Sequence, residues 1–233
     1  MAGTSVVGAV SRVMKLLSGL ALLTAGSLLW NASWQRWAGV CGRGPETALC
    51  TQRQDHRFDF LPPGEPWEPL GTTARLGGSA LLVLAGALLL LTIALAGTRI
   101  GPVLVAVVTA LAFASQGIGI LRSDEAGVAV DPDLPALTQT GWLLGPVVLL
   151  VWLAVVTRGW DRASAIVLLM GSPLVAYLSY AMGSFDAGPW WEAIMGSWIA
   201  LAGVCLLVAT VRGGSRRRAI RQAEVTSEPI AAM

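Results

Sequence analysis

His56, the only histidine among the 233 residues, lies in the segment of this chain that comes nearest to a catalytic or metal-binding motif. It stands within Asp55-His56-Arg57-Phe58-Asp59. An Asp-His-x-x-Asp pattern can supply two or three metal ligands, or pair a general base with a carboxylate. A single histidine in a charged loop is more often a solvated surface residue. We therefore predict no metal site and no cofactor here, and keep His56 as a candidate contact residue.

A second acidic segment carries Asp124-Glu125 and Asp131-Pro132-Asp133. Paired carboxylates at a membrane surface can bind a divalent cation for a transfer reaction. The same residues are ordinary turn chemistry, and the sequence contains no serine-protease, zinc-protease, P-loop or dinucleotide-binding fingerprint. The sequence therefore favours a non-enzymatic protein without catalytic residues. An enzyme that uses His56 and these carboxylates is the alternative.

Two cysteines, Cys41 and Cys50, follow closely after Trp34 and Trp37. On the outer side of a membrane such a pair can oxidise, and closing so small a loop stabilises it by roughly 2–3 kcal/mol. Free thiols or a redox role are the alternatives, but the C-x-x-C spacing of dithiol oxidoreductases is absent. We predict a disulfide between Cys41 and Cys50.

The segment Trp37-Ala38-Gly39-Val40-Cys41, followed by Cys50, resembles the first extracellular loop of the claudin family, in which a Trp precedes two cysteines at similar spacing. Arg75 precedes the next apolar run, as an Arg does in that family. Here one more residue separates the Trp from the first Cys, and the apolar runs outnumber the four spans of claudins. The resemblance covers residues 31–76 and implies a disulfide-closed, Trp-anchored outer loop.

Long apolar blocks separate these candidate residues and must form the framework that positions them. Only 13% of the residues are charged, against roughly 25% in soluble domains. Uncharged blocks of about 18 residues or more are typical of membrane spans. The sequence therefore predicts an all-α, polytopic membrane helical bundle that contacts the lipid bilayer. The net charge of +2 is too small to indicate a nucleic-acid partner.

Six spans are predicted, which form one transmembrane domain over residues 1–211. The second and third spans are joined by so short a link that they must form an antiparallel hairpin, and Pro173 is expected to kink the fifth. The basic start before the first span is also typical of a signal peptide, but the run lacks a clean pair of small residues before a cleavage site. A flexible cytoplasmic tail is expected over residues 212–233. The spans cover residues 14–30, 77–98, 100–121, 137–157, 163–185 and 193–211, with an outer loop over residues 31–76.

Loop charges predict the orientation of the spans. With both termini in the cytoplasm, the inner segments hold ten basic and three acidic residues, a net charge of +7. The outer segments then hold six Arg and eleven acidic residues, a net charge of −5. Fifteen of the sixteen basic residues are Arg, which indicates a GC-rich genome. We therefore expect the cell (inner) membrane of a prokaryote.

The spans themselves lack the residues that most coupled transporters need. No Asp, Glu, Lys, Arg or His stands at mid-depth in the second to sixth spans, which argues against proton relays and against haem ligation. Small residues recur at helical spacing on the last span and predict close contact with another helix, within the bundle or with a partner subunit. A basic cluster after this span is explained by attraction to anionic lipid. The small residues are Gly196, Ala200 and Gly203, and the basic ones are Arg212, Arg216, Arg217 and Arg218.

A non-enzymatic membrane component is the largest functional class that remains. We expect an accessory or partner-binding subunit whose outer loop contacts a membrane-protein partner. An uncoupled transporter or channel is an alternative, because polar side chains in the spans could line a path. The membrane subunit of an ATP-driven exporter is another, although its inner links are too short for coupling helices. The contact residues are Trp34, Trp37, His56 and Trp67, and the polar span residues are Thr109, Ser115, Gln116, Ser172, Tyr177, Ser179 and Tyr180.

Overall fold

The computed structural model describes residues 3–41, 47–61, 63–97, 99–132, 135–182 and 190–227, with side chains placed at residues 8–136 and 138–179 of this set and at 190–212. The described residues form eight α-helices and one short 3-10 turn, with no β-strand among them. The predicted all-helical architecture is therefore confirmed. The elements are α1 (Gly3–Trp37), α2 (Ala48–Arg53), η1 (His56–Phe58), α3 (Thr73–Ala96), α4 (Ile100–Ala126), α5 (Pro135–Val156), α6 (Gly159–Met170), α7 (Pro173–Met182) and α8 (Trp191–Ser227).

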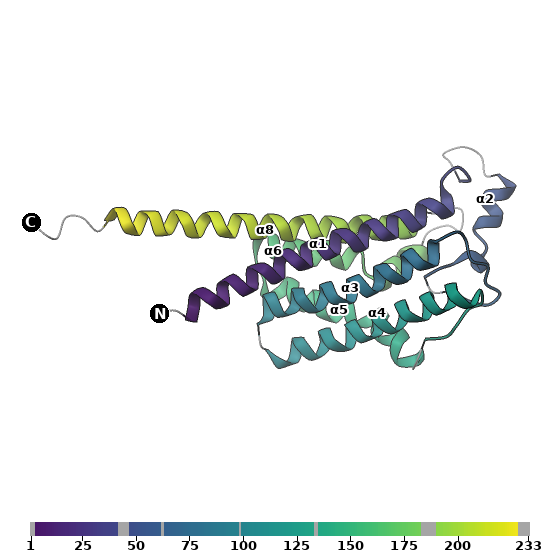
Figure 1. The fold of residues 1–233 in the computed structure, drawn as a ribbon, viewed down its shortest axis with the longest axis horizontal. Helices are drawn as coiled ribbons and strands as arrows, with labels where there is room; N and C mark the ends of the chain where they lie inside the picture. Colours follow the sequence, from purple (N-terminus) through teal and green to yellow (C-terminus); the bar gives the residue numbers. More distant parts are fainter. Residues whose placement is uncertain are drawn as a thin grey trace, which may run out of the picture.

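The long helices pack side by side in a ring that closes where α8 meets α1 (Figure 1). α1 packs against both α8 and α3, and the contacts continue from α3 through α4, α5 and α6 back to α8. α3 and α4 form the hairpin that their short link predicts, and it turns at Gly97, whose φ of +64° favours glycine. The helices enclose a core of buried apolar side chains, among them Leu29, Leu88, Phe113, Leu153 and Ile199.

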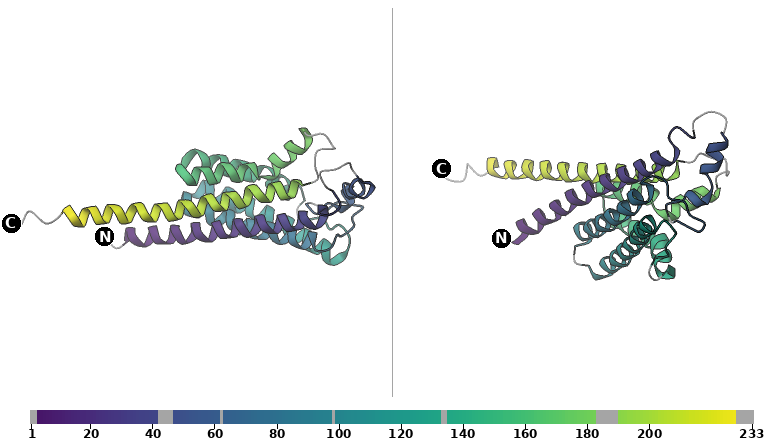
Figure 2. Two further views of the ribbon diagram at one scale, coloured as in Figure 1. Left: turned by 90° about the horizontal axis from the view of Figure 1, so that it is seen from above. Right: turned by 45° about the vertical axis from the view of Figure 1, so that its right-hand side comes forward.

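Five of the described helices are long and apolar enough to cross a membrane, and counting α6 and α7 together gives six. These two helices meet at a bend of 50°. Pro173 begins α7 and has no backbone N–H to donate back into α6, so the helix ends at Met170 instead of only kinking. Figure 2 shows α7 diverging from the bundle. The span predicted over residues 163–185 is therefore broken in two, and its last residues lie outside the described part.

α1 and α8 both extend beyond their predicted ends. The outer loop predicted from residue 31 begins later, because α1 continues to Trp37. Ala32 and Ser33 are fully buried on these last turns, so packing maintains the helix where its sequence turns polar. α8 continues to Ser227, through the tail that was expected to lack regular structure. Its Arg, Ala and Gln residues have good helix propensity.

Glycines bring the backbones of α1 and α8 together along the two helices, which lie side by side in both views of Figure 2. A Cβ on Gly203 would lie 2.7 Å from the carbonyl oxygen of Gly19, and one on Gly196 would lie 2.7 Å from that of Gly26. These distances leave no room for a side chain. The structure therefore places the predicted small-residue stripe, Ala200 included, against α1 inside the bundle.

Serine hydroxyls also join neighbouring helices. Ser18 on α1 donates to the carbonyl oxygen of Ala87 on α3 at 2.9 Å. Ser164 on α6 donates to that of Ala202 on α8, also at 2.9 Å. Both serines are fully buried. Each hydroxyl therefore forms a hydrogen bond between two helices and fixes the distance between them.

The residues considered for a polar path do not share one environment. Thr109 is buried against Gly145 and donates to the carbonyl oxygen of Val105 in its own helix. Ser115 accepts from the Thr138 hydroxyl across the contact of α4 and α5. Tyr177 is 63% exposed on α7, and the side chain of Tyr180 lies outside the described ones. The positions of these residues therefore do not support a continuous polar path through the bundle.

Candidate functional site: the cap end of the bundle

The segment between α1 and α3, residues 38–72, covers the end of the bundle where α1 ends and α8 begins (Figure 1). We call this segment the cap. Both of its short helices start at a side-chain oxygen that accepts a backbone N–H: Thr47 accepts from Cys50, and Asp55 from Arg57. Because these local bonds satisfy the helix ends, the described part of the cap is folded rather than a simple connection.

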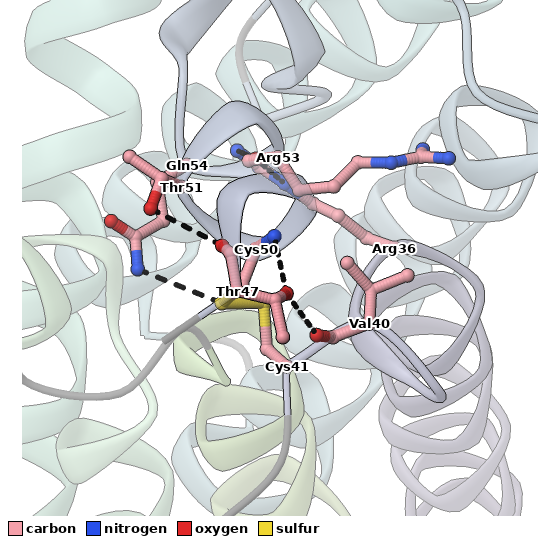
Figure 3. The surroundings of a disulfide bond; sticks show 8 residues. All are labelled: Arg36, Val40, Cys41, Thr47, Cys50, Thr51, Arg53 and Gln54. Carbon is pink, nitrogen blue, oxygen red and sulfur yellow. Dashed lines mark hydrogen bonds between the residues drawn. A yellow bond between two sulfur atoms is a disulfide. The ribbon is translucent and has the colours of Figure 1, made fainter. Parts of the chain in front are cut away.

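A disulfide joins Cys41 to Cys50 inside the cap (Figure 3). Both cysteines are buried with Trp37 in a small apolar cluster, apart from the main core. The Thr47 hydroxyl donates to the carbonyl oxygen of Val40 at 3.3 Å, which holds the start of α2 near the end of α1. The predicted disulfide is confirmed.

Replacing Cys50 should remove both the crosslink and part of the stability of the protein. We expect Cys50→Ser to lower the free energy of unfolding by about 2–3 kcal/mol, because the open chain gains loop entropy. The measurement is denaturant unfolding in detergent, with the mobility of reduced and oxidised protein compared on a gel. Cys205→Ser is the control, since Cys205 is a free buried cysteine in α8. If the gel mobility of the parent protein is the same with and without reductant, the disulfide is contradicted.

Arg36, near the end of α1, is a buried cation that connects the cap to two helices. Only 4% of its side chain is exposed. The guanidinium forms ion pairs with Asp59 Oδ1 at 2.7 Å and with Glu192 Oε1 at 3.2 Å. It also donates to the carbonyl oxygen of Arg53 at 3.1 Å and lies 4.2 Å from the ring centroid of Trp37. One side chain thus joins α1, α8, the end of α2 and the loop after η1.

Glu192 is the matching anion in the first turn of α8, where the helix dipole favours a carboxylate. Besides Arg36, it accepts from the Ser33 hydroxyl at 3.3 Å and from Trp37 Nε1 at 3.2 Å. Arg36 and Trp37 follow Ser33 by three and four positions on α1, so all three donors lie on one side of the helix. Glu192 consequently fixes the beginning of α8 against the end of α1.

Two aromatic side chains fasten the second half of the cap. Phe60 is 1% exposed and occupies the space that a Cβ on Gly77 of α3 would need. Trp67 is 7% exposed, and its Nε1 donates to the carbonyl oxygen of Asp59 at 2.8 Å. The residue that pairs with Arg36 is therefore itself held in place by a buried tryptophan.

The structure separates the four residues predicted to contact a partner. Trp37, at the end of α1, and Trp67, in the cap, are both buried, so their side chains contact the protein itself. Trp34 is 54% exposed and lies on α1 rather than in a loop. The His56 side chain is 66% exposed at the start of η1.

Three tryptophans lie together beside the cap. The ring centroid of Trp190 is 6.4 Å from that of Trp30 and 5.8 Å from that of Trp34. Trp30 is 44% exposed, so this aromatic cluster reaches the surface of the bundle. Exposed indole rings at one level are typical of residues that settle among lipid headgroups.

Two carboxylates of the cap, those of Asp55 and Asp59, make contacts that stabilise the cap itself. Burial raises the pKa of Asp59 above its ordinary value, and the Arg36 cation opposes that rise. The pKa of Asp55 is lowered, chiefly because its carboxylate accepts from the backbone N–H of Arg57. His56 Nδ1 lies 3.2 Å from Asp55, but no three His, Cys, Asp or Glu side chains among the described residues are grouped as metal ligands would be.

One carboxylate of the second acidic segment also forms an ion pair between helices. Asp124, at the end of α4, pairs with Arg75 of α3 at 3.1 Å. Asp133 lies outside the described residues. Among the described residues, these carboxylates and His56 form no group of three that could hold a metal ion.

Charged residues also join helices at the opposite end of the bundle. Lys15 of α1 pairs with Asp161 of α6 at 2.7 Å, and both side chains are mostly buried. Arg212 of α8 lies 5.1 Å from the ring centroid of Trp160. Of the predicted basic cluster, only the Arg212 side chain is among the described ones. Its contact is with the bundle itself.

Comparison with protein-family models, with curated proteins and with solved structures finds no match for this chain. The claudin-like spacing around Trp37 and Cys41 therefore remains a local resemblance.

The central ion pair of the site, Arg36 with Glu192, was not predicted from the sequence. Arg36 and Glu192 are 156 positions apart, and each lies where a polar residue is expected next to a span. Their pairing depends on α8 returning to α1. The available signal was that Arg36 and Glu192, which carry opposite charges, stand six residues after the first predicted span and one residue before the last.

Proposed function

We propose that this chain is a multi-pass protein of a prokaryotic cell membrane, with the cap outside and both termini in the cytoplasm. The two layers of ion pairs support this placement. Lys15 and Arg36 are 21 positions apart on α1, which is about 32 Å along a helix. A bilayer has a hydrocarbon core of about 30 Å. No charged residue stands on α1 between them, and the loop charges favour the cap as the outer side.

Within that membrane, the protein acts as a non-enzymatic accessory subunit whose cap binds a partner protein. The observation that carries this proposal is the anchoring of the cap by Arg36. A buried ion pair, a disulfide and two buried tryptophans hold a surface segment that contains no assembled catalytic group in its described part. A rigid surface loses little conformational entropy on association, which favours binding.

The binding surface includes the exposed residues of α2 and η1. Leu49 is 48% exposed on α2, and the exposed His56 follows seven residues later, at the start of η1. The exposed leucine and the exposed imidazole offer one apolar and one polar contact on the cap. Apolar side chains with a polar rim are the usual composition of a protein interface.

Site-specific photo-crosslinking tests this function. A photo-crosslinking amino acid in place of Leu49 or of His56 should give an adduct of one defined mass in intact cells. The control position is Val155, which is 70% exposed at the far end of α5 from the cap. Labelling of His56→Cys by a membrane-impermeant maleimide verifies that the cap is outside.

The adduct should weaken when Cys50→Ser is added, because the binding surface then loses its internal crosslink. Adducts that form equally at Val155, or no adduct at either cap position, would contradict the proposal.

A further inference from the structure

The free face of α1 differs in composition from the other surfaces that would contact lipid. Apart from Trp30, its exposed positions between residues 17 and 31 follow alternate spacings of three and four residues. We call this row the α1 seam. Three of its five side chains are polar and uncharged. The seam consists of Leu17, Leu20, Thr24, Ser27 and Asn31.

Corresponding faces of the neighbouring helices are apolar. The exposed side chains of α4 as far as Ile118 are aliphatic, and α8 exposes a single serine, Ser197, among apolar residues. α5 exposes Gln139 and Thr140 in its first turns, but its exposed side chains from Leu144 onward are aliphatic. Among these helices, only α1 thus has a polar row that extends over several turns. On α4 the aliphatic residues are Ile100, Leu104, Val107, Val108, Leu111 and Ile118, and on α5 they are Leu144, Val148, Val151, Val155 and Val156.

The seam retains hydrogen-bonding capacity beyond its own helix. The Thr24 hydroxyl donates to the carbonyl oxygen of Leu20 at 3.1 Å, and the Asn31 amide donates to that of Ser27 at 2.7 Å. A hydroxyl oxygen can also accept, and an amide carries a second N–H and a carbonyl oxygen. In lipid these groups find no partner, whereas a second helix can supply one.

We propose that two copies of this protein pair through their α1 seams, about a two-fold axis perpendicular to the membrane. Copies inserted with the same orientation place identical residues at the same depth. Thr, Ser and Asn are self-complementary there, because each is both donor and acceptor. The seam contains no charge that would repel its own copy. Alternate spacings of three and four are also the pattern of two helices packed with a left-handed crossing.

This pairing rests on the membrane placement proposed above, and not on the binding role of the cap. The seam lies on α1 below the cap, away from Leu49 and His56. A dimer could therefore form whether or not the cap has a partner. Trp34 continues the seam toward the cap. Because both copies have the same orientation, the two caps of a dimer lie on the same side of the membrane.

Disulfide crosslinking in native membranes tests the pairing. The full-length protein with Cys205→Ser and Ser27→Cys should form a covalent dimer under mild oxidation. Val148→Cys in the same background is the matched control, because Val148 is 57% exposed on α5 at a comparable depth. It should remain monomeric. Equal crosslinking at both positions, or a constant adduct with another protein at Ser27→Cys, would overturn the proposal.

Energy transfer between differently labelled copies in vesicles gives a second readout. The triple variant Thr24→Leu, Ser27→Leu, Asn31→Leu should lower the association constant by about tenfold, since interhelical hydrogen bonds are lost while the apolar surface is kept. Val148→Leu should leave it unchanged. Absence of energy transfer in the parent protein would also overturn the pairing. The cap adducts at Leu49 should persist in the triple variant, which separates the two proposals.

Discussion

Arg36→Met is expected to cost about 3–5 kcal/mol of the free energy of unfolding and to release the cap from the bundle. The substituted side chain is close in length, so little packing is lost. The penalty arises because Glu192 and Asp59 lose their shared cation. Glu192 is only 14% exposed and would keep an uncompensated charge near the start of α8. Unfolding in mixed micelles measures the stability, and proteolysis of the cap in the folded protein measures its release.

Arg75→Met is the matched control for this substitution. Arg75 also pairs with an aspartate across two helices, but 68% of its side chain is exposed. Exposed pairs contribute about 1 kcal/mol or less, so this variant should be nearly as stable as the parent. Glu192→Gln and Asp59→Asn, added to Arg36→Met, should recover part of the loss, because the orphaned charges are then gone. Equal stabilities of the Arg36 and Arg75 variants would show that the buried network does not anchor the cap.

Gly26→Ala is expected to destabilise the protein by about 1–3 kcal/mol, because the added Cβ forces α1 and α8 apart. At this position a Cβ would contact the carbonyl oxygen of Gly196 and would lie 2.8 Å from the backbone nitrogen of Ala200. Neither is a flexible side-chain end, so the clash can be relieved only by moving a helix. The effect should appear as a lower midpoint of unfolding. The backbone N–H groups around Glu192, which lies one turn before Gly196, should also exchange faster with solvent hydrogen.

Gly86→Ala on α3 separates this packing effect from helix propensity. Alanine is favoured over glycine within a helix by up to about 1 kcal/mol, and both substitutions gain this term. A Cβ on Gly86 meets no atom within 4 Å. The Gly86 variant should therefore be as stable as the parent or slightly more stable. If Gly26→Ala behaves in the same way, the close contact of α1 and α8 is not required for folding.

These two substitutions probe the two ends of one structural arrangement. The glycines set the distance between α1 and α8, and that distance brings Glu192 within reach of Ser33, Arg36 and Trp37. The cap is positioned on this pair of helices through Asp59 and the disulfide. A change in helix spacing should therefore be transmitted to the cap. If the proposed binding surface lies at α2, it therefore depends on the packing of α1 against α8.

Local and compositional features were predictable from the sequence. Long uncharged apolar runs predict helices, because a helix satisfies the hydrogen bonds of its own backbone in an apolar environment. The pairing of Cys41 with Cys50 was predictable because so short a loop closes at small entropic cost. The break at Pro173 was anticipated only as a kink, since the missing N–H is visible in the sequence but the choice between bending and ending a helix depends on its neighbours.

Tertiary structure alone decided what the polar residues at the helix ends do. Six of the described α-helices lie between Arg36 and Glu192 in the chain, and the two residues meet because α8 closes the ring against α1. The same closure extends α1 through Asn31–Trp37, where local propensity would let the helix end, and buries Trp37 and Trp67 instead of exposing them. Sequence determined the elements because propensity and hydrophobicity act over a few turns. Burial, ion pairing and the free seam of α1 were decided by contacts between segments that only the fold brings together.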